Sequence, residues 1–211
     1  WQLHNLRGVQ FQRARVPVDA VGTQMELIVA VDASSELKIA GIWVRFKRRN
    51  GKWSCQLLIG RSLLVKLMES IPRAELESLV MGSNLLHIVL RALDGWVSDY
   101  IMISDSVISL CWVTAENKRM SIYHRNRCNQ IRMNTDLSKL LHVVSEANPS
   151  DVATRSEKVS LASVGPGSVW ESGLPWMTES IEDAISNNIL KPVKELRTSP
   201  EEDDEIGRAH V

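Results

Sequence analysis

The sequence predicts an α/β domain in which a mixed sheet of five strands is flanked by helices. Two apolar runs surround Asn50-Gly51, the dipeptide most typical of a tight β-hairpin, and this predicts antiparallel pairing. Residues 72–93 place apolar side chains at helical spacing. Two later apolar runs, 99–104 and 139–144, are separated by segments of helical character, which favours parallel pairing between them. Antiparallel pairing followed by parallel pairing indicates a mixed sheet with helices on its faces.

Three strands and one long helix are predicted in the first half of the domain. Residues 26–33 (ELIVAVDA) form an apolar run rich in β-branched side chains, which is typical of a buried strand. The two hairpin strands follow at residues 39–47 and 53–59. Pro72 suits the first turn of the long helix, because that position needs no backbone N–H donor, and Gly95 ends it.

Short strands and helices alternate in the second half of the domain. A strand is predicted over residues 99–104, followed by helices over 106–115 and about 122–133. The fifth strand is predicted over residues 139–144, and Pro149 begins a further short helix. This order requires crossover connections, so the later strands are expected to lie parallel to one another.

The domain is predicted to span residues 26–156, with flanking segments on both sides. Residues 1–25 are expected to be a connector from a preceding region, and the chain reads as a piece of a longer protein. Residues 157–180 join a Gly- and Ser-containing linker to VWESGLPWM (169–177), whose two tryptophans are expected to dock on the domain. Residues 181–211 end in an acidic run and are expected to form a flexible linker.

The composition is that of a globular protein. Of the 211 residues, 44% are hydrophobic and 24% are charged, and the formal net charge of +0 argues against a chain that binds polyanions over its whole surface. Charge is uneven, however, because residues 45–52 are strongly basic and residues 201–205 are acidic. The three cysteines are too widely spaced for a zinc motif, and their odd number favours a reducing compartment. The sequence has neither a signal peptide nor an apolar run near 20 residues, so no membrane partner is expected.

Four carboxylates stand at the ends of predicted elements. Asp32 ends the first strand and Asp105 ends the fourth, whereas Glu75 and Asp151 lie in the first turns of helices. Strand ends and helix starts of this kind can converge on one rim of an open sheet. Each acid also has a structural explanation, because acids favour the first turn of a helix and Asp105 could cap the next helix.

Together, the four carboxylates indicate a metal site. Carboxylates that converge repel one another unless a cation is present. Oxygen ligands suit Mg²⁺ and Mn²⁺, and two such ions about 3.5–4 Å apart form a clamp for in-line displacement at phosphorus. The sequence therefore predicts metal-assisted hydrolysis of a phosphodiester.

The residues around these acids resemble a known family, the ribonuclease H domain in the Pol polyproteins of Bel/Pao-type long-terminal-repeat retrotransposons. The resemblance covers about residues 26–177. It rests on four motifs in the family's order: VDASS (31–35), IPRAELESL (71–79), ISDSVISLCWV (103–113) and HVVSEANPSDVATR (142–155). The segment VWESGLPWM is similar to the tryptophan-bearing stretch that follows the domain in that group.

This resemblance implies a ribonuclease H-like fold and a two-metal endonuclease that cuts the RNA strand of RNA–DNA hybrids during reverse transcription. It implies that Mg²⁺, or Mn²⁺ in its place, is held by four catalytic acids: Asp32, Glu75, Asp105 and Asp151. The expected partners are the hybrid itself and the reverse transcriptase and integrase of the same polyprotein, in a cytoplasmic retroelement particle. On this view, residues 1–25 connect to the reverse transcriptase.

Several polar residues near the motifs are candidate contacts to nucleic acid. Three of them could contact the substrate backbone or support the acids, and turn or cap chemistry explains them equally well: Ser34, Ser106 and Asn148. Three cations at the predicted hairpin tip could hold phosphates, and a solvated tip explains them equally well: Arg48, Arg49 and Lys52.

Two other functions, an aspartic peptidase and a module without catalysis, agree less well with the sequence than a ribonuclease H does. A retroelement aspartic peptidase would need a carboxylate dyad, usually within Asp-Thr/Ser-Gly, and the sequences after Asp32 and Asp105 lack that glycine. A ribonuclease H-like connection module without catalysis would usually have lost an acid. The intact set of four acids counts against such a module, although a domain that keeps them can still lack activity.

Overall fold

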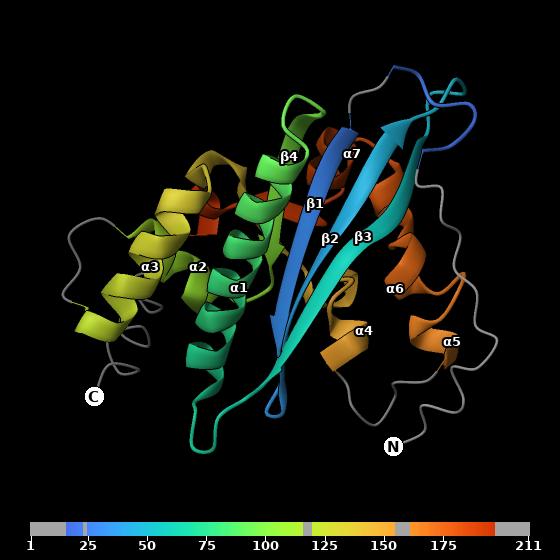
Figure 1. Ribbon diagram of the computed structural model, residues 1–211. Coiled ribbons are helices and arrows are strands. Elements are labelled where there is room, and N and C mark those ends of the chain that lie inside the picture. The colour runs from blue at the N-terminus through green and yellow to red at the C-terminus, as the bar shows by residue number, and fades with distance from the viewer. Residues whose placement is uncertain (1–15, 23–24, 116–119, 155–160, 197–211) are drawn as a thin grey trace.

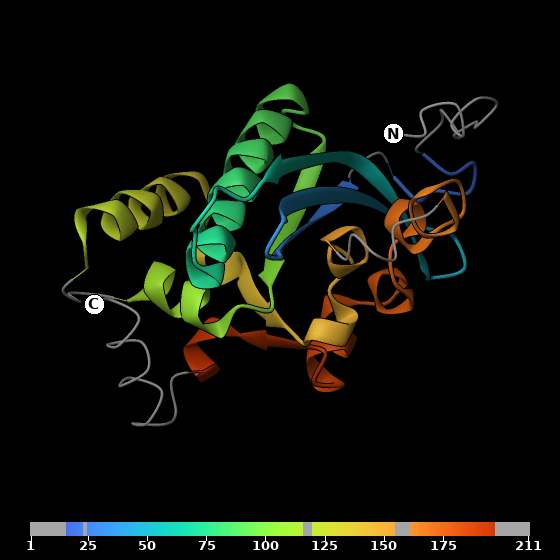
Figure 2. The same ribbon diagram turned by 90° about the horizontal axis from the view of Figure 1, so that it is seen from below.

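The computed structural model describes residues 16–22, 25–115, 120–154 and 161–196. They form one six-stranded sheet with helices against both of its faces (Figures 1 and 2). The strand order is β3-β2-β1-β4-β5-β6. The predicted α/β class and the mixed sheet are therefore confirmed, with six strands in place of the five expected.

The first three strands form the antiparallel half of the sheet. β1 (Met25–Ala33) pairs with β2 (Leu37–Lys47), and β2 pairs with β3 (Trp53–Leu64). Gly51 in the connecting turn has a φ of 81°, a backbone conformation that favours glycine and explains the hairpin signal. β3 is longer than predicted, because residues 60–64 continue to pair with β2 although their side chains are exposed.

Helical crossovers build the parallel half of the sheet. α1 (Ile71–Ala92) leads to β4 (Val97–Ser104), which lies parallel to β1. α2 (Val107–Thr114) and α3 (Ile122–Asn134) lead to β5 (Leu140–Val143), which lies parallel to β4. Both parallel pairings agree with the sequence prediction. Among the described residues, no helix is both long and apolar enough to cross a membrane.

The side chains of β1 alternate between two cores on opposite faces of the sheet. Leu27, Val29 and Val31 belong to the core beneath α1. Ile28 and Ala30 belong to the second core, on the other face. None of the five is more than 1% exposed, so the central strand is buried on both sides.

α1 approaches the sheet closely at Gly82. A Cβ atom at this position would lie 2.6 Å from Val31 Cγ1 and 3.0 Å from Met102 Cε. We expect Gly82→Ala to lower the free energy of unfolding by about 1–3 kcal/mol, because overpacking outweighs the better helix propensity of alanine. Urea denaturation measures the change. His87→Ala, at an exposed site of the same helix, should have little effect, and a stabilised Gly82→Ala protein would contradict the packing.

Short helical segments follow β5 and gather on the second face of the sheet (Figure 2). They are η3 (Ser145–Ala147), α4 (Asp151–Thr154), α5 (Leu161–Val164), α6 (Val169–Ser172) and η5 (Pro175–Thr178). One further turn, η2 (Leu137–Lys139), precedes β5. α5 lies within a segment for which the sequence predicts a linker.

The tryptophan-bearing segment 169–177 packs against the second face of the sheet. Trp43 Nε1 on β2 donates a hydrogen bond to the Trp170 carbonyl over 3.0 Å, and the two indole rings meet edge to face. Trp176 Nε1 donates to the Ala147 carbonyl, also over 3.0 Å. Gly60 leaves room for this packing, because a Cβ atom there would lie 2.9 Å from the Trp170 ring.

The end of the described chain corrects the sequence prediction. Residues 181–196 form α7 (Ile181–Ser186), β6 (Leu190–Pro192) and η6 (Val193–Leu196) instead of a flexible linker. β6 pairs antiparallel with β5 and supplies the sixth strand. Three buried side chains hold this segment against the domain: Ala184, Leu190 and Val193. Residues 197–211, with the acidic run, lie outside the described residues.

Candidate active site

Asp32 and Asp105 lie at the same edge of the sheet. β1 and β4 are parallel neighbours, and Ala30 is paired with Ile103. Continuing this register by two residues places Asp32 beside Asp105, at the carboxyl ends of both strands. Both side chains are half-buried, and the charge of Asp105 raises the pKa of Asp32. The two strand-end acids expected from the sequence are therefore neighbours.

Glu75 and Asp151 reach this edge from the two faces of the sheet. Glu75 is the fifth residue of α1, which begins at Ile71, and so lies at the start of the second turn instead of in the predicted first turn. The charge of Asp105 raises the pKa of Glu75. Asp151 is the first residue of α4, and its charge raises the pKa of Asp32. Each of these two acids thus interacts with one of the strand-end acids.

Two hydroxyl groups bond to the acids at this edge. The Thr154 hydroxyl donates to Asp32 Oδ2, and the Ser106 hydroxyl donates to Glu75 Oε2 over 2.5 Å. Ser106 Oγ also accepts a bond from the Ser109 amide over 3.2 Å, so this serine both caps α2 and contacts an acid. Ser106 therefore supports an acid and caps a helix, whereas its contact to nucleic acid stays a prediction.

The pKa of Asp32 is raised to about 7. Burial is the main cause, and the hydrogen bond from Thr154 opposes it. Repulsion from Asp105, and more weakly from Asp151, raises this pKa further. For Glu75, burial and Asp105 likewise raise the pKa while the bond from Ser106 lowers it. Repulsion between neighbouring carboxylates therefore contributes to the raised pKa values of both Asp32 and Glu75.

The carboxylates fit a hard divalent cation by their chemistry. All four side chains offer oxygen ligands only, which suits Mg²⁺ and Mn²⁺, and their mutual repulsion favours a bound cation. Within the described residues, no three His, Cys, Asp or Glu side chains are grouped closely enough to hold a metal ion. The charge interactions instead link the acids in pairs: Asp32 with Asp105, Asp32 with Asp151, and Glu75 with Asp105. Two of the carboxylates, Asp32 and Glu75, are engaged by the hydroxyl groups of Thr154 and Ser106.

Asn148 ties the loop before α4 to both strand ends. Its Nδ2 donates to the Val31 carbonyl over 3.0 Å and to Asp105 Oδ1 over 3.3 Å. Its Oδ1 accepts a bond from the Ser150 amide over 3.1 Å, and the residue is 2% exposed. Asn148 therefore supports an acid from a buried position. Ser34, by contrast, accepts bonds from the amides of Glu36 and Leu37 and stabilises the β1–β2 turn beside Asp32.

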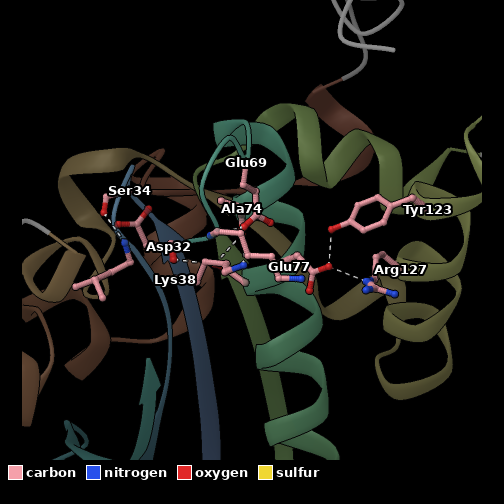
Figure 3. Close-up of polar contacts among 11 residues, drawn as sticks. Asp32, Ser34, Lys38, Glu69, Ala74, Glu77, Tyr123 and Arg127 are labelled. Carbon is pink, nitrogen blue, oxygen red and sulfur yellow. Dashed lines mark hydrogen bonds and ion pairs between the residues drawn. The ribbon is translucent and has the colours of Figure 1, made fainter. Parts of the chain in front are cut away.

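Three hydroxyl residues at this edge were not singled out from the sequence. Besides Thr154, Ser78 Oγ on α1 donates to the Asp32 carbonyl over 2.9 Å (Figure 3 shows the neighbourhood), and Ser150 Oγ donates to the Ala30 carbonyl over 2.9 Å. Such residues carry no signal of their own in the sequence. Only Thr154 could have been found, because it follows Asp151 by three residues and a helix places such pairs on one face.

The basic hairpin tip does not lie beside the acids. β2 begins near Asp32, runs 11 residues antiparallel to β1 and ends just before Arg48, so the tip is about 35 Å away along the sheet (Figure 1). Arg48 Nε forms an ion pair with Asp19 over 2.9 Å, whereas Arg49 and Lys52 are exposed. The structure thus separates the predicted phosphate contacts from the predicted catalytic acids.

Another set of charged residues joins the first turns of α1 to α3 (Figure 3). Glu77 Oε1 accepts a bond from the Tyr123 hydroxyl over 2.5 Å and from Arg127 Nε over 2.7 Å. The Arg73 guanidinium lies 4.3 Å from the centre of the Tyr123 ring. These contacts fix the start of α3 against the first two turns of α1, and Arg73 remains exposed.

Comparison with known structures gives ribonuclease H domains at low similarity. The N-terminal RNase H domain of a Mycobacterium tuberculosis protein, solved as a fusion with maltose binding protein, is 11% identical with a TM-score of 0.40, and the match covers 64% of this chain and 94% of that one. LC11-RNase H1, isolated from compost by a metagenomic approach, is 16% identical with a TM-score of 0.42, covering 65% and 96%. RNase H1 from Halobacterium salinarum is 11% identical with a TM-score of 0.38, covering 64% and 96%.

Comparison with known sequences assigns the family. No curated protein matches the chain. The Pao retrotransposon-like RNaseH-like domain matches residues 2–106, about half of the chain. The matched region contains Asp32, Glu75 and Asp105, but ends before Asp151. This match agrees with the resemblance seen in the motifs, and the chain therefore belongs to the Pao retrotransposon-like RNaseH-like domain family.

Proposed function

We propose that this domain is a metal-dependent ribonuclease H that hydrolyses the RNA strand of RNA–DNA hybrids during retroelement reverse transcription. The observation that carries the proposal is the convergence of Asp32 and Asp105 at one edge of the sheet, with Glu75 and Asp151 coupled to them. Carboxylates gathered at a rim formed by strand ends and helix starts suit metal-assisted phosphoryl chemistry.

The four acids would hold two Mg²⁺ ions, and Mn²⁺ can replace them. When bound, such ions activate water and stabilise the charge on the leaving oxygen. The chain's own residues position the acids. Asn148 orients the Asp105 carboxylate, and the hydroxyl groups of Thr154 and Ser106 orient Asp32 and Glu75. Ser78 and Ser150 fix the end of β1 through backbone carbonyls, which keeps Asp32 at the rim.

The substrate would lie across the edge of the sheet and extend towards the hairpin tip. Distinguishing an RNA strand requires contacts to its 2′-hydroxyl groups and to the shape of the minor groove. The distance from the acids to the tip is about 35 Å, close to one helical turn of a duplex. One face of a hybrid could therefore meet the acids and, a turn away, the exposed Arg49 and Lys52.

Neutralising the hairpin tip should weaken hybrid binding without affecting the chemical step. For the double variant Arg49→Gln/Lys52→Gln we expect a higher KM and an unchanged kcat. The plot of log affinity against log salt concentration should have a negative slope whose magnitude is smaller by about 1–2 than in the parent. Binding assays at several salt concentrations measure this slope. Lys194→Gln with Arg91→Gln, two exposed cations away from the acids and the hairpin tip, is the matched control. An unchanged slope in the tip variant would remove these residues from the substrate surface.

The proposed function is tested with substrates labelled separately on each strand. The chain is incubated with Mg²⁺ and an RNA–DNA hybrid, an RNA duplex or a DNA duplex of the same sequence. We expect internal cuts in the RNA strand of the hybrid alone, and none in the presence of a chelator. Cutting of the DNA strand, or of the RNA duplex at a similar rate, would contradict the assignment.

A further inference from the structure

A cavity of about 580 Å³ lies on the second face of the sheet, at the end opposite the acids. Glu26 on β1 lines it, six residues before Asp32 on the same face of the strand, which separates the two sites by about 20 Å. Neighbouring strands of the sheet, the turn η2 and α2 contribute further lining residues, and α7, β6 and the turn η6 contribute others from the segment after residue 180. The cavity shares no residue with the candidate active site.

Arg45 is the unusual residue of this cavity. It is directly cross-strand from Glu26, and its side chain is 1% exposed. Arg45 Nη2 lies 3.2 Å from Glu26 Oε2, but no described residue accepts a well-formed hydrogen bond from Nε, Nη1 or Nη2. A buried guanidinium with unused donors is costly, because the lost hydration is not replaced. Its one stacking contact is the Trp53 ring, whose centre is 4.4 Å from the guanidinium carbon.

Glu26 holds Arg45 only weakly. The Glu26 side chain is 27% exposed, against 1% for Arg45, so solvent reaches the carboxylate of this pair and hardly reaches the guanidinium. Burial is the main cause that raises the pKa of Glu26, and the charges of Asp99 and Glu182 raise it further. The charge of Arg45 lowers this pKa. Because its surroundings disfavour the charged form of Glu26, the carboxylate of a ligand can displace the Glu26 carboxylate from the Arg45 guanidinium.

We propose that this cavity binds an organic carboxylate, with the carboxylate group on the Arg45 guanidinium and an apolar chain against the cavity wall. The planar guanidinium presents parallel N–H donors that match the two oxygens of a carboxylate. The wall beside it is apolar and includes Ile101, Ile181 and Ile185. A site that combines one charged anchor with apolar walls is typical of small-molecule binding.

The charges of the cavity favour a carboxylate over a phosphate. Three acids line it, Glu26, Asp99 and Glu182, and so do three cations, Arg45, Lys139 and Lys194, of which Lys139 is paired with Asp99 over 2.6 Å. A dianion would therefore meet no excess of positive charge in the cavity, whereas a single negative charge is balanced by Arg45.

The proposal is tested by titrating the full chain with hexanoate, and separately with inorganic phosphate. Isothermal calorimetry gives the affinity, and the NMR signal of the Arg45 Nε–H group reports whether that donor is engaged. We expect saturable hexanoate binding with a Kd of about 1 mM or lower, a shifted Nε–H signal, and at least about tenfold weaker binding of phosphate.

Two variants with opposite expected effects identify the anchor. Arg45→Met should weaken hexanoate binding at least about tenfold, and Arg91→Met, at an exposed arginine of α1, should leave it unchanged. Glu26→Gln should strengthen binding at least about threefold, because the competing carboxylate is gone, and it tests the proposal even if Arg45→Met fails to fold. No saturable binding by the parent, equal binding by Arg45→Met, tighter binding of phosphate, or weaker binding by Glu26→Gln would each overturn the proposal.

Discussion

Asp32→Asn is expected to stabilise the metal-free domain by about 2–4 kcal/mol at pH 8.5. The pKa of Asp32 is about 7 in the folded chain, against 3.8 for an ordinary Asp, and one pKa unit corresponds to about 1.4 kcal/mol. The unfolded chain releases this proton near pH 4, whereas the folded chain keeps it until about pH 7. The parent protein therefore loses stability as pH rises from about 4 to 7, and asparagine, which never ionises, avoids this loss.

Urea denaturation at pH 4 and at pH 8.5, both with chelator, measures this effect. The two proteins should be almost equally stable at pH 4, where Asp32 is protonated in the folded parent, and should differ at pH 8.5. Asp94→Asn, at an exposed carboxylate, is the control and should not change the difference between the two pH values. A stability gap that is the same at both pH values would contradict the raised pKa of the buried Asp32.

Adding Mg²⁺ at pH 8.5 should reduce the difference in stability between Asp32→Asn and the parent. A cation bound to the folded state stabilises it by mass action, and the parent keeps the Asp32 carboxylate that the variant lacks. We expect the parent to gain more stability than Asp32→Asn. Equal gains would remove Asp32 from the metal ligands. The same substitution would thus stabilise the fold and abolish catalysis, a trade-off that is common where like charges are gathered for function.

Leu190→Ala is expected to lower the free energy of unfolding by about 2–5 kcal/mol, the usual cost of truncating a fully buried leucine. Leu190 is 0% exposed, lies in β6 opposite Val143 of β5, and belongs to the core of the second face. The substitution therefore tests whether residues 181–196 are part of the domain.

Lys191→Ala is the matched control for this substitution. Lys191 is the next residue of β6 and is exposed, so its truncation should change stability by no more than about 0.5 kcal/mol. Thermal or urea denaturation of both variants gives the comparison. Similar small effects of both changes would contradict the sixth strand and favour the linker that the sequence suggested.

The hydrophobic pattern was sufficient for the main elements of the fold. The buried run of β1, the Asn50-Gly51 turn and the helical spacing of α1 are strong local signals, and each led to an element close to its observed bounds. The sixth strand gave no such signal. β6 has only three residues, and Leu190 is its one fully buried side chain, so its strand conformation depends on pairing with β5 rather than on its own pattern.

The candidate site could be predicted only in part, for a related reason. Asp32 and Asp105 follow strands whose pairing can be inferred, so their convergence was accessible from the sequence. The hydroxyl groups of Thr154 and Ser106 act on acids more than 30 residues away, and such contacts depend on the packing of whole elements. The composition of the basic hairpin tip gave no information on its distance from the acids, because that distance follows from the length of β2.

The most direct test of the account is cleavage of a labelled RNA–DNA hybrid by the 211-residue chain in Mg²⁺ or Mn²⁺, measured for the parent and for Asp105→Asn. Circular dichroism confirms that both proteins are folded, and Asp94→Asn serves as a control of equal charge change. The account predicts metal-dependent cutting of the RNA strand by the parent, and a rate reduced by about 10³-fold or more in Asp105→Asn. A folded parent that does not cut with either ion would favour a connection module without catalysis, and an Asp105→Asn protein that cuts like the parent would contradict the assignment of the site.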